Sequence, residues 1–167
     1  MAKEKAPVTP AIRLLKKEGV PYKEHLYQFA GKGVTAHASE VLGLDEHLLI
    51  KTLIMEDDRK NPLIILMHGD LQVSTRGLAR ALGVKSVTPC TPEVAQKHSG
   101  YLVGGTSPFG VRHPMPVYIE DTILELPCIY INGGKRGFMI EMATEDLVRV
   151  LKPTPVHVGF APGHEPE

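Results

Sequence analysis

Residues 48–67 read LLIKTLIMEDDRKNPLIILM and form a largely apolar stretch of the chain. It contains two aliphatic runs, Leu48–Met55 and Leu63–Met67, separated by a charged segment that ends in Asn61-Pro62. Short apolar runs bounded by polar turn residues are typical of buried strands. We therefore expect two strands here.

Helix signals and further strand signals lie on both sides of this stretch. Helices are expected where Thr or Ser precedes an apolar periodic run: Pro10 to Gly19 after Thr9, Ala36–Leu42 after Thr35, Arg76–Leu82 after Ser74 or Thr75, Pro92–Lys97 after Thr91, and Glu145–Leu151 after Thr144. Strands are expected at Pro21–Gln28, Tyr101–Val103, Pro116–Ile119, Ile129–Asn132 and Phe138–Glu141. Because strands and helices do not alternate regularly, the pattern predicts an α+β or mixed α/β domain and not a doubly wound sheet.

The length of the chain, 167 residues, predicts one domain. We place it at residues 9–152. Residues 1–8 are short and charged, and we expect a flexible segment there. Residues 153–167 contain four prolines and two glycines and are expected to form a loose tail.

Composition excludes several functional classes. The 19 basic residues balance the 19 acidic ones, which argues against a strongly basic nucleic-acid binder and against an acidic disordered chain. No apolar run is long enough to span a membrane, and the first residues, MAKEKAPVTP, lack the apolar segment of a signal peptide. Cys90 and Cys128 form no disulfide framework. A cytoplasmic protein is expected.

Lys51 is the most informative single residue, because it interrupts the first aliphatic run. A lysine in a strand that is buried on both faces is costly unless it is paired or reaches a polar cavity. Two interpretations stay open. The strand lies at an edge and Lys51 extends to water, or Lys51 points into a cleft and binds an anion or a carbonyl oxygen.

Two glycine-rich loops are further candidates. Residues 100–110, GYLVGGTSPFG, can bring backbone N–H groups close to a carboxylate, carbonyl or phosphate; a plain tight connection between strands is the alternative. Residues 132–137, NGGKRG, are either a solvated hairpin tip or a phosphate contact. Neither loop matches a nucleotide-binding motif.

Other side chains give no clear motif. The eight histidines are scattered without HxxxH or HExxH spacing, so no metal site is expected. Ser107 does not lie in a GxSxG nucleophile elbow. Cys90 and Cys128 are expected to be small buried apolar residues.

Four segments together resemble the YbaK/EbsC family of bacterial aminoacyl-tRNA deacylases, which are related to the editing domain of bacterial prolyl-tRNA synthetase. They are TPAIRLLKKEGVPYKEHLY (residues 9–27), IKTLIM (50–55), GYLVGGTSPFG (100–110) and INGGKRGFMIEM (131–142). The resemblance covers residues 8–152 and is closest to the Cys-tRNA(Pro) deacylase branch. It implies a single compact domain built around a mixed, barrel-like sheet flanked by helices.

The resemblance also implies a reaction. The ester that joins a wrong amino acid to tRNA would be hydrolysed without metal or cofactor, and prolyl-tRNA synthetase would be a partner. Since no side chain is an obvious nucleophile, substrate-assisted catalysis is implied. The thiol of a cysteinyl substrate would attack its own ester and leave as a thiolactone, a lyase-type step, whereas for other amino acids a tRNA hydroxyl would position water.

Family roles can be assigned to residues of this chain. Lys51 matches the catalytic lysine, and Tyr27 matches a tyrosine that lines the pocket. Gly104 and Gly105 match glycines whose backbone lies at the scissile ester. The remaining residues of the expected substrate-binding set are Thr52, Thr106, Ser107, Pro108, Arg136 and Met139.

Two departures from the family pattern affect substrate choice. Met139 stands where Cys-specific members carry Asp, and the Phe29–Val34 loop is shorter. Cysteine is the first expectation and alanine or another small amino acid the rival. A catalytically inactive module that binds tRNA or prolyl-tRNA synthetase, and a hydrolase of other small esters, are further alternatives.

The cations of the candidate site are few: Lys51, Arg112, Lys135 and Arg136. They suit a grip on the terminal nucleotides of tRNA better than contact along a duplex. We therefore expect weak tRNA binding by the protein alone.

Overall fold

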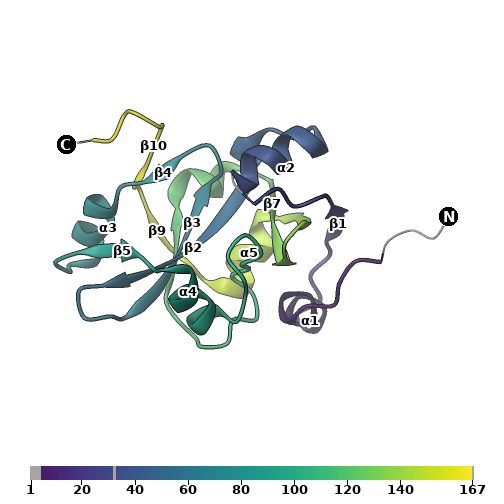
Figure 1. The fold of residues 1–167 in the computed structure, drawn as a ribbon, viewed down its shortest axis with the longest axis horizontal. Helices are drawn as coiled ribbons and strands as arrows, with labels where there is room; N and C mark the ends of the chain where they lie inside the picture. The colour runs from purple at the N-terminus through teal and green to yellow at the C-terminus, as the bar shows by residue number, and fades with distance from the viewer. Residues whose placement is uncertain (1–4, 32, 167) are drawn as a thin grey trace.

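A computed structural model describes residues 5–31 and 33–166 (Figure 1). Its centre is an antiparallel pair of strands, β2 (Leu49–Asp57) and β3 (Pro62–His68), in which Lys51 lies opposite Met67. Residues 63–68 of β3 are all buried, because β3 has strands on both sides and packed side chains on both faces. Both strands predicted from residues 48–67 are confirmed.

The main sheet is mixed and has eight strands. Seven of them follow the order β1-β8-β7-β2-β3-β6-β9, and β5 joins β2 on the same side as β7. The pairs β2–β7, β3–β6 and β6–β9 are parallel. The further strands are β1 (Lys23–Leu26), β5 (Val87–Pro89), β6 (Val117–Glu120), β7 (Cys128–Lys135), β8 (Phe138–Ala143) and β9 (Thr154–Val156). A small second sheet pairs β4 (Gln72–Val73) with β10 (Gly159–Phe160).

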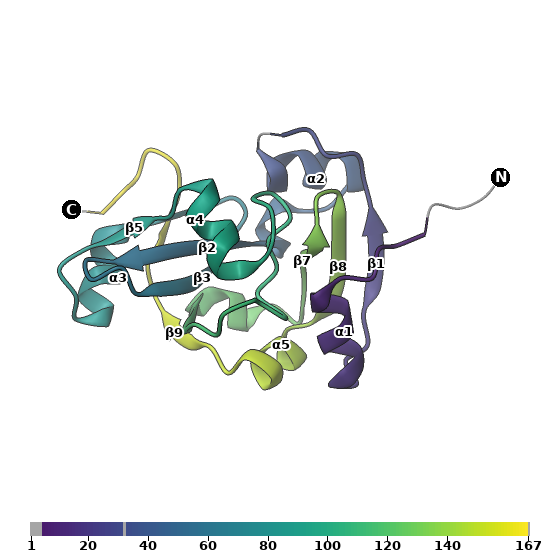
Figure 2. The same cartoon turned by 60° about the horizontal axis from the view of Figure 1, so that its bottom comes forward.

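In the described part of the chain, five α-helices flank the sheet, as predicted: α1 (Pro10–Lys17), α2 (Val34–Leu42), α3 (Thr75–Leu82), α4 (Pro92–Ser99) and α5 (Thr144–Leu151). Two short 3-10 helices, η1 (Glu46–Leu48) and η2 (Asp121–Glu125), precede β2 and β7. Figure 2 shows α1 and α2 beside β7, β8 and β1, and α3 and α4 beside β2, β3 and β5. The side chains of Thr9, Ser74 and Thr91 cap α1, α3 and α4, as the sequence predicted.

Two apolar clusters hold the layers together. The larger packs α1 against β7 and β8, with Leu15, Ile131 and Phe138 fully buried. The second packs Leu78 of α3 on Ile65 and Met67 of β3. At roughly 25 cal/mol per Å² of apolar surface, burial of this kind supplies most of the driving force for folding.

Several details of the prediction are wrong. Tyr101–Val103 is not a strand: the Tyr101 hydroxyl donates to the carbonyl of Phe109, and Gly105 N–H donates to the carbonyl of Leu102, which makes a turn. Thr35 does not cap α2. The helix begins at Val34, and the residue before it, Gly33, has a left-handed conformation. Thr144 is the first residue of α5, not its cap.

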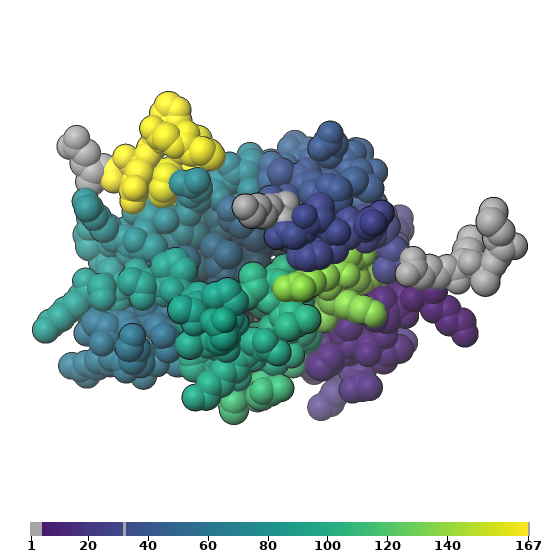
Figure 3. Space-filling model, in the orientation of Figure 1, coloured from purple at the N-terminus to yellow at the C-terminus, as the bar shows by residue number. Residues whose placement is uncertain are grey.

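The expected C-terminal tail is also ordered in part. β9 extends the main sheet, β10 pairs with β4, and Val158 between them is buried. Figure 3 shows this segment (yellow) lying against the neighbouring blue and teal surface. The sheet path is open, with β1 and β9 at its ends, and no pairing among the described residues closes it into a barrel. Residues 1–4 of the expected flexible N-terminal segment lie outside the described residues.

Candidate active site

A gap in the main sheet creates the principal pocket. β7 pairs with β2 only at Leu49 and Ile50, and β5 pairs with β2 only from Met55 onward. Between these points β7 deviates from a regular ladder at Asn132, where its register with β8 shifts. β-Bulges of this kind bend a strand away from its neighbours. The edge of β2 at residues 51–53 therefore opens on one side.

The pocket in this gap has a volume of about 300 Å³. Its polar lining comes from Thr35, Lys51, Thr52, Cys90, Thr106 and Asn132. Its apolar lining comes from Val34, Ile50, Leu53, Ile54, Met55, Pro89, Ala95, Val103, Gly104 and Met139. A mostly apolar pocket with a few converging polar groups is typical of a small-ligand site.

Lys51 lies in this pocket, half-buried, and not at a free sheet edge that faces only water. Burial lowers the pKa of Lys51, because it penalises the charged ammonium. The carboxylates of Glu46 and Asp70 act in the opposite direction and favour the charged form. The site thus holds a partly desolvated cation that two nearby carboxylates support.

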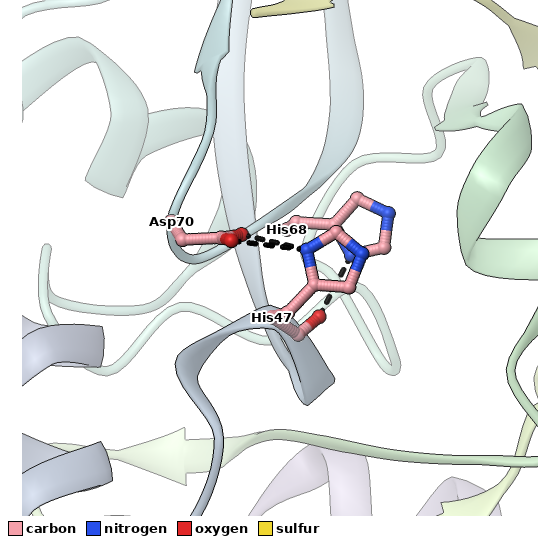
Figure 4. A group of neighbouring side chains, drawn as sticks. All are labelled: His47, His68 and Asp70. Carbon is pink, nitrogen blue, oxygen red and sulfur yellow. Dashed lines mark hydrogen bonds and ion pairs between the residues drawn. The ribbon is translucent and has the colours of Figure 1, made fainter. Parts of the chain in front are cut away.

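Asp70 belongs to a cluster with His47 and His68 (Figure 4). His47 Nδ1 lies 3.0 Å from both Asp70 oxygens, and the two imidazole rings stack 3.7 Å apart. His68 is fully buried, and burial lowers its pKa. Its Nδ1 donates to the carbonyl of His47 and its Nε2 lies 2.7 Å from the hydroxyl of Thr122. The cluster fixes the Asp70 carboxylate near Lys51.

The second carboxylate is held by the start of α2. The Thr35 hydroxyl donates to Glu46 over 2.8 Å, and Thr35 lines the pocket. Gly69 allows the close approach this requires, because a Cβ there would lie 2.7 Å from the Thr35 Cβ. The polar side chain that the sequence suggested as a helix cap therefore orients Glu46.

Gly104 and Gly105 pack against the β7–β8 hairpin. A Cβ on Gly104 would lie 2.8 Å from the Phe29 ring, and one on Gly105 would lie 2.6 Å from the amide nitrogen of Arg136. Gly104 also has a φ of +92°, which favours glycine. Arg136 Nε donates to the carbonyl of Val103, and its guanidinium lies 4.8 Å from the centre of the Phe29 ring. Only glycine fits at these two positions.

The rest of this loop divides between pocket and core. Thr106 lines the pocket. Ser107 is fully buried, and its hydroxyl accepts from the amide of Phe109. Pro108 is buried as well. Ser107 and Pro108 shape the loop and do not line the pocket.

Tyr27 and Met139 lie together at the other side of the pocket. Met139 is buried and lines it, and Tyr27, which does not line it, packs against the small cluster formed by Met139, Ala38 and Leu49. Burial raises the pKa of Tyr27, and its hydroxyl is a buried group without a hydrogen-bond partner among the described residues. Thr52 does line the pocket, and its hydroxyl is also buried without a hydrogen-bond partner among the described residues.

Among the described residues, three groups of side chains lie close enough together to hold a metal ion: His47, His68 and Asp70; Glu56, Cys90 and His98; and Glu120, Asp121 and His157. In each, the potential ligands already bond to protein groups. His68 uses both ring nitrogens, Glu120 accepts from the amides of Val158 and Gly159, and His98 Nε2 lies 3.3 Å from Glu56. Burial raises the pKa of Cys90 to about 11, so its thiol is protonated at neutral pH.

Comparison with known proteins agrees with this geometry. Residues 32–150 match the model of the aminoacyl-tRNA editing domain. EbsC of Enterococcus faecalis, named as a candidate Cys-tRNA(Pro)/Cys-tRNA(Cys) deacylase, is 30% identical over 89% of this chain and 92% of its own length.

The chain belongs to the aminoacyl-tRNA editing domain family.

Other relatives place this editing domain in a wider group. The proline–tRNA ligase of Thermodesulfovibrio yellowstonii is 30% identical over 81% of this chain, which spans 22% of the ligase. A solved structure described as a candidate trans-editing enzyme for prolyl tRNA synthetase has the same fold, with a TM-score of 0.78 at 18% identity and coverage of 93% of this chain and 100% of that one. The resemblance to the YbaK/EbsC family is confirmed.

Sequence reasoning missed part of the pocket of this editing domain. The sequence predicts Thr35 as a helix cap and Asn132 as the last residue of a strand and the first of the NGGKRG loop, and Cys90 and Ala95 come from the β5–α4 region, which carries no motif. Their convergence depends on strand pairing across the chain.

No helix in the described part of the chain is long and apolar enough to cross a membrane.

Proposed function

We propose that this protein is a trans-editing deacylase that hydrolyses the ester of mischarged tRNA, with Cys-tRNA(Pro) as first substrate. The observation that carries the proposal is the position of Lys51. Its partly desolvated side chain lines a small, mostly apolar pocket that Gly104 also lines. A cation in such a setting can hold a terminal phosphate of tRNA or stabilise the oxyanion that develops on the ester.

The described residues supply binding and electrostatics and no activated nucleophile. Ser107 is buried against its own loop, and the Cys90 thiol stays protonated. Substrate-assisted chemistry fits this arrangement. The thiol of a cysteinyl ester would attack its carbonyl carbon, the bond to the tRNA hydroxyl would break, the thiol proton would pass to that oxygen, and a thiolactone would leave. With other amino acids, a tRNA hydroxyl would position a water molecule.

The size and lining of the pocket favour a small, uncharged amino acid. The pocket is small, at about 300 Å³, and none of the described residues that line it offers a carboxylate to bind a basic side chain. Met139, where Cys-specific members carry Asp, makes that wall apolar and keeps alanine as the rival substrate. Tyr27 supports Met139, and Thr52, Gly104, Gly105 and Thr106 form the substrate-binding set, with Arg136 holding the loop.

A deacylation assay tests the function. tRNA(Pro) charged with cysteine, alanine or proline is incubated with the protein, and loss of the ester is followed. Loss of cysteine or alanine, but not proline, supports editing. Binding to prolyl-tRNA synthetase without hydrolysis would support an inactive module instead, and cleavage of simple esters alone would support a general esterase.

A further inference from the structure

The main chain of Thr52 faces the gap in the sheet. On the β3 side, Lys51 pairs with Met67 and Leu53 with Ile65, and Gly69 N–H donates to the carbonyl of Leu49. On the opposite side, Cys90 N–H donates to the carbonyl of Ile54. Successive residues of a strand direct their N–H and C=O groups to opposite sides. The N–H and C=O of Thr52 therefore point away from β3, toward β7 and β5.

Neither neighbouring strand reaches these groups. The ladder with β7 ends at Ile50, and the ladder with β5 starts at Met55. Within residues 5–31 and 33–166, no strand pairing or loop hydrogen bond satisfies Thr52 on this side. The Thr52 hydroxyl is buried without a partner as well. Unpaired polar groups inside a fold are uncommon, and three on one residue in a pocket point to a ligand.

An aminoacyl ester has the complementary groups. It is a single amino-acid residue, with an α-ammonium donor and a carbonyl acceptor on either side of one α-carbon. In an antiparallel ladder, two residues that face each other can exchange both N–H···O=C bonds. The spacing that Thr52 offers to a neighbouring strand is thus also the spacing of an aminoacyl group.

We propose that Thr52 pairs with the aminoacyl group of the substrate as it would pair with a residue of an adjacent strand. Its carbonyl accepts from the α-ammonium, and its N–H donates to the ester carbonyl oxygen. This rests on the proposed function. The N–H also stabilises the negative charge that develops on that oxygen during attack. This pairing recognises the α-ammonium and the carbonyl, which all aminoacyl groups share. The apolar walls of the pocket select the side chain.

A substrate series tests the α-ammonium contact. The protein is given tRNA(Pro) carrying the amino acid it removes, the deamino analogue (3-mercaptopropionyl for cysteine, propionyl for alanine) and the N-acetyl form. Each kcat/KM is divided by the rate of hydroxide hydrolysis of the same ester. The deamino and N-acetyl esters are expected to be about tenfold or more poorer, the worth of one charge-assisted hydrogen bond.

The outcomes separate this proposal from the function it rests on. Equal normalised rates on the three esters would overturn the pairing and leave the deacylase function in place. No hydrolysis of any charged tRNA would overturn both.

A backbone substitution tests the N–H contact directly. An α-hydroxy acid with the side chain of threonine, introduced at residue 52, replaces the N–H by an ester oxygen. The matched control is the same change at Ile65, which pairs with Leu53 in the β2–β3 ladder and does not line the pocket. Both variants lose some stability. We expect about a tenfold fall in kcat only at residue 52, and equal kcat in the two variants would overturn the proposal.

Discussion

The side-chain amide of Asn132 donates a hydrogen bond of 3.2 Å to the main-chain carbonyl of Gly104, 28 residues earlier in the chain. The same amide donates to the carbonyl of Lys135, and its oxygen accepts from the amides of Gly134 and Lys135. One buried side chain thus shapes the β7 bulge that opens the pocket and attaches the glycine loop to it.

Replacing Asn132 with Ala removes all four bonds. We expect a loss of about 1–3 kcal/mol in the free energy of unfolding, and a larger fall in deacylation than in stability, because the loop loses its position. Asn132→Asp keeps the two accepted bonds but places a carboxylate oxygen against the carbonyls of Gly104 and Lys135, so it should lose stability and activity as the Ala variant does. Denaturant unfolding and single-turnover deacylation measure the two effects. Full activity in Asn132→Ala would contradict the role of this side chain.

A methyl group on Gly105 should disrupt the loop. The Cβ of Gly105→Ala would lie 2.6 Å from the amide nitrogen of Arg136, and backbone cannot move aside as a flexible side chain can. We expect deacylation to fall about tenfold or more, with a destabilisation of about 1–3 kcal/mol. The control is Gly77→Ala in α3, which lies away from the pocket. Equal activity of both variants would show that the close approach is unnecessary.

The pH dependence follows from the direction of the Lys51 shift. Burial lowers its pKa, so activity that needs the protonated ammonium is lost as pH rises through a value below the ordinary 10.5. Glu46 and Asp70 raise that pKa. Glu46→Gln and Asp70→Asn should therefore move the alkaline limb of the rate profile to lower pH, while Asp58→Asn, at an exposed site, should leave it in place. An unmoved limb in both variants would contradict the assignment.

The salt dependence of tRNA affinity should not exceed what a few cations can produce. Lys51 lies in the pocket, the exposed Lys135 and Arg136 lie beside the Gly104-Gly105 loop, and the exposed Arg112 lies beside Gly100, outside the pocket lining. Four cations correspond to a slope of log K against log salt no steeper than about −4. Lys135→Gln should reduce the slope, and Lys17→Gln on α1 should not. A markedly steeper slope would show an extended tRNA surface that these residues do not explain.

Local chemistry made much of the fold predictable. Thr9 and Thr91, each followed by proline, and Ser74 mark helix starts in the structure as they do in the sequence. The aliphatic runs at 48–55 and 63–67 are strands because their length and composition suit little else. The local prediction was wrong where a side chain makes a tertiary hydrogen bond instead of the local structure expected of it. Thr35 bonds to Glu46, and Tyr101 is anchored by Phe109 instead of extending into a strand.

The pocket was harder to predict from the sequence than the fold. Lys51 was identified because it breaks an apolar run, but its cleft exists only because β7 bends away at Asn132 and β5 joins β2 late. β9 (Thr154–Val156) is likewise ordered by its pairing with β6, far away in the sequence, although the prolines and glycines of residues 153–167 indicate a loose tail. Pairings between residues far apart in sequence leave no periodic pattern for a single sequence to show.

Lys51 is expected to carry deacylation without being required for the fold. The lowered pKa of Lys51 means that burying its charged ammonium lowers the free energy of unfolding. Lys51→Met should therefore be at least as stable as the parent chain at neutral pH. The direct test is single-turnover hydrolysis of Cys-, Ala- and Pro-tRNA(Pro) by the parent protein and by Lys51→Met, with thermal unfolding of both. We expect the parent protein to remove cysteine or alanine and spare proline, and the variant to unfold no earlier while its rate falls about a hundredfold or more. Parent-like deacylation by a folded Lys51→Met protein would show that Lys51 does not carry the reaction.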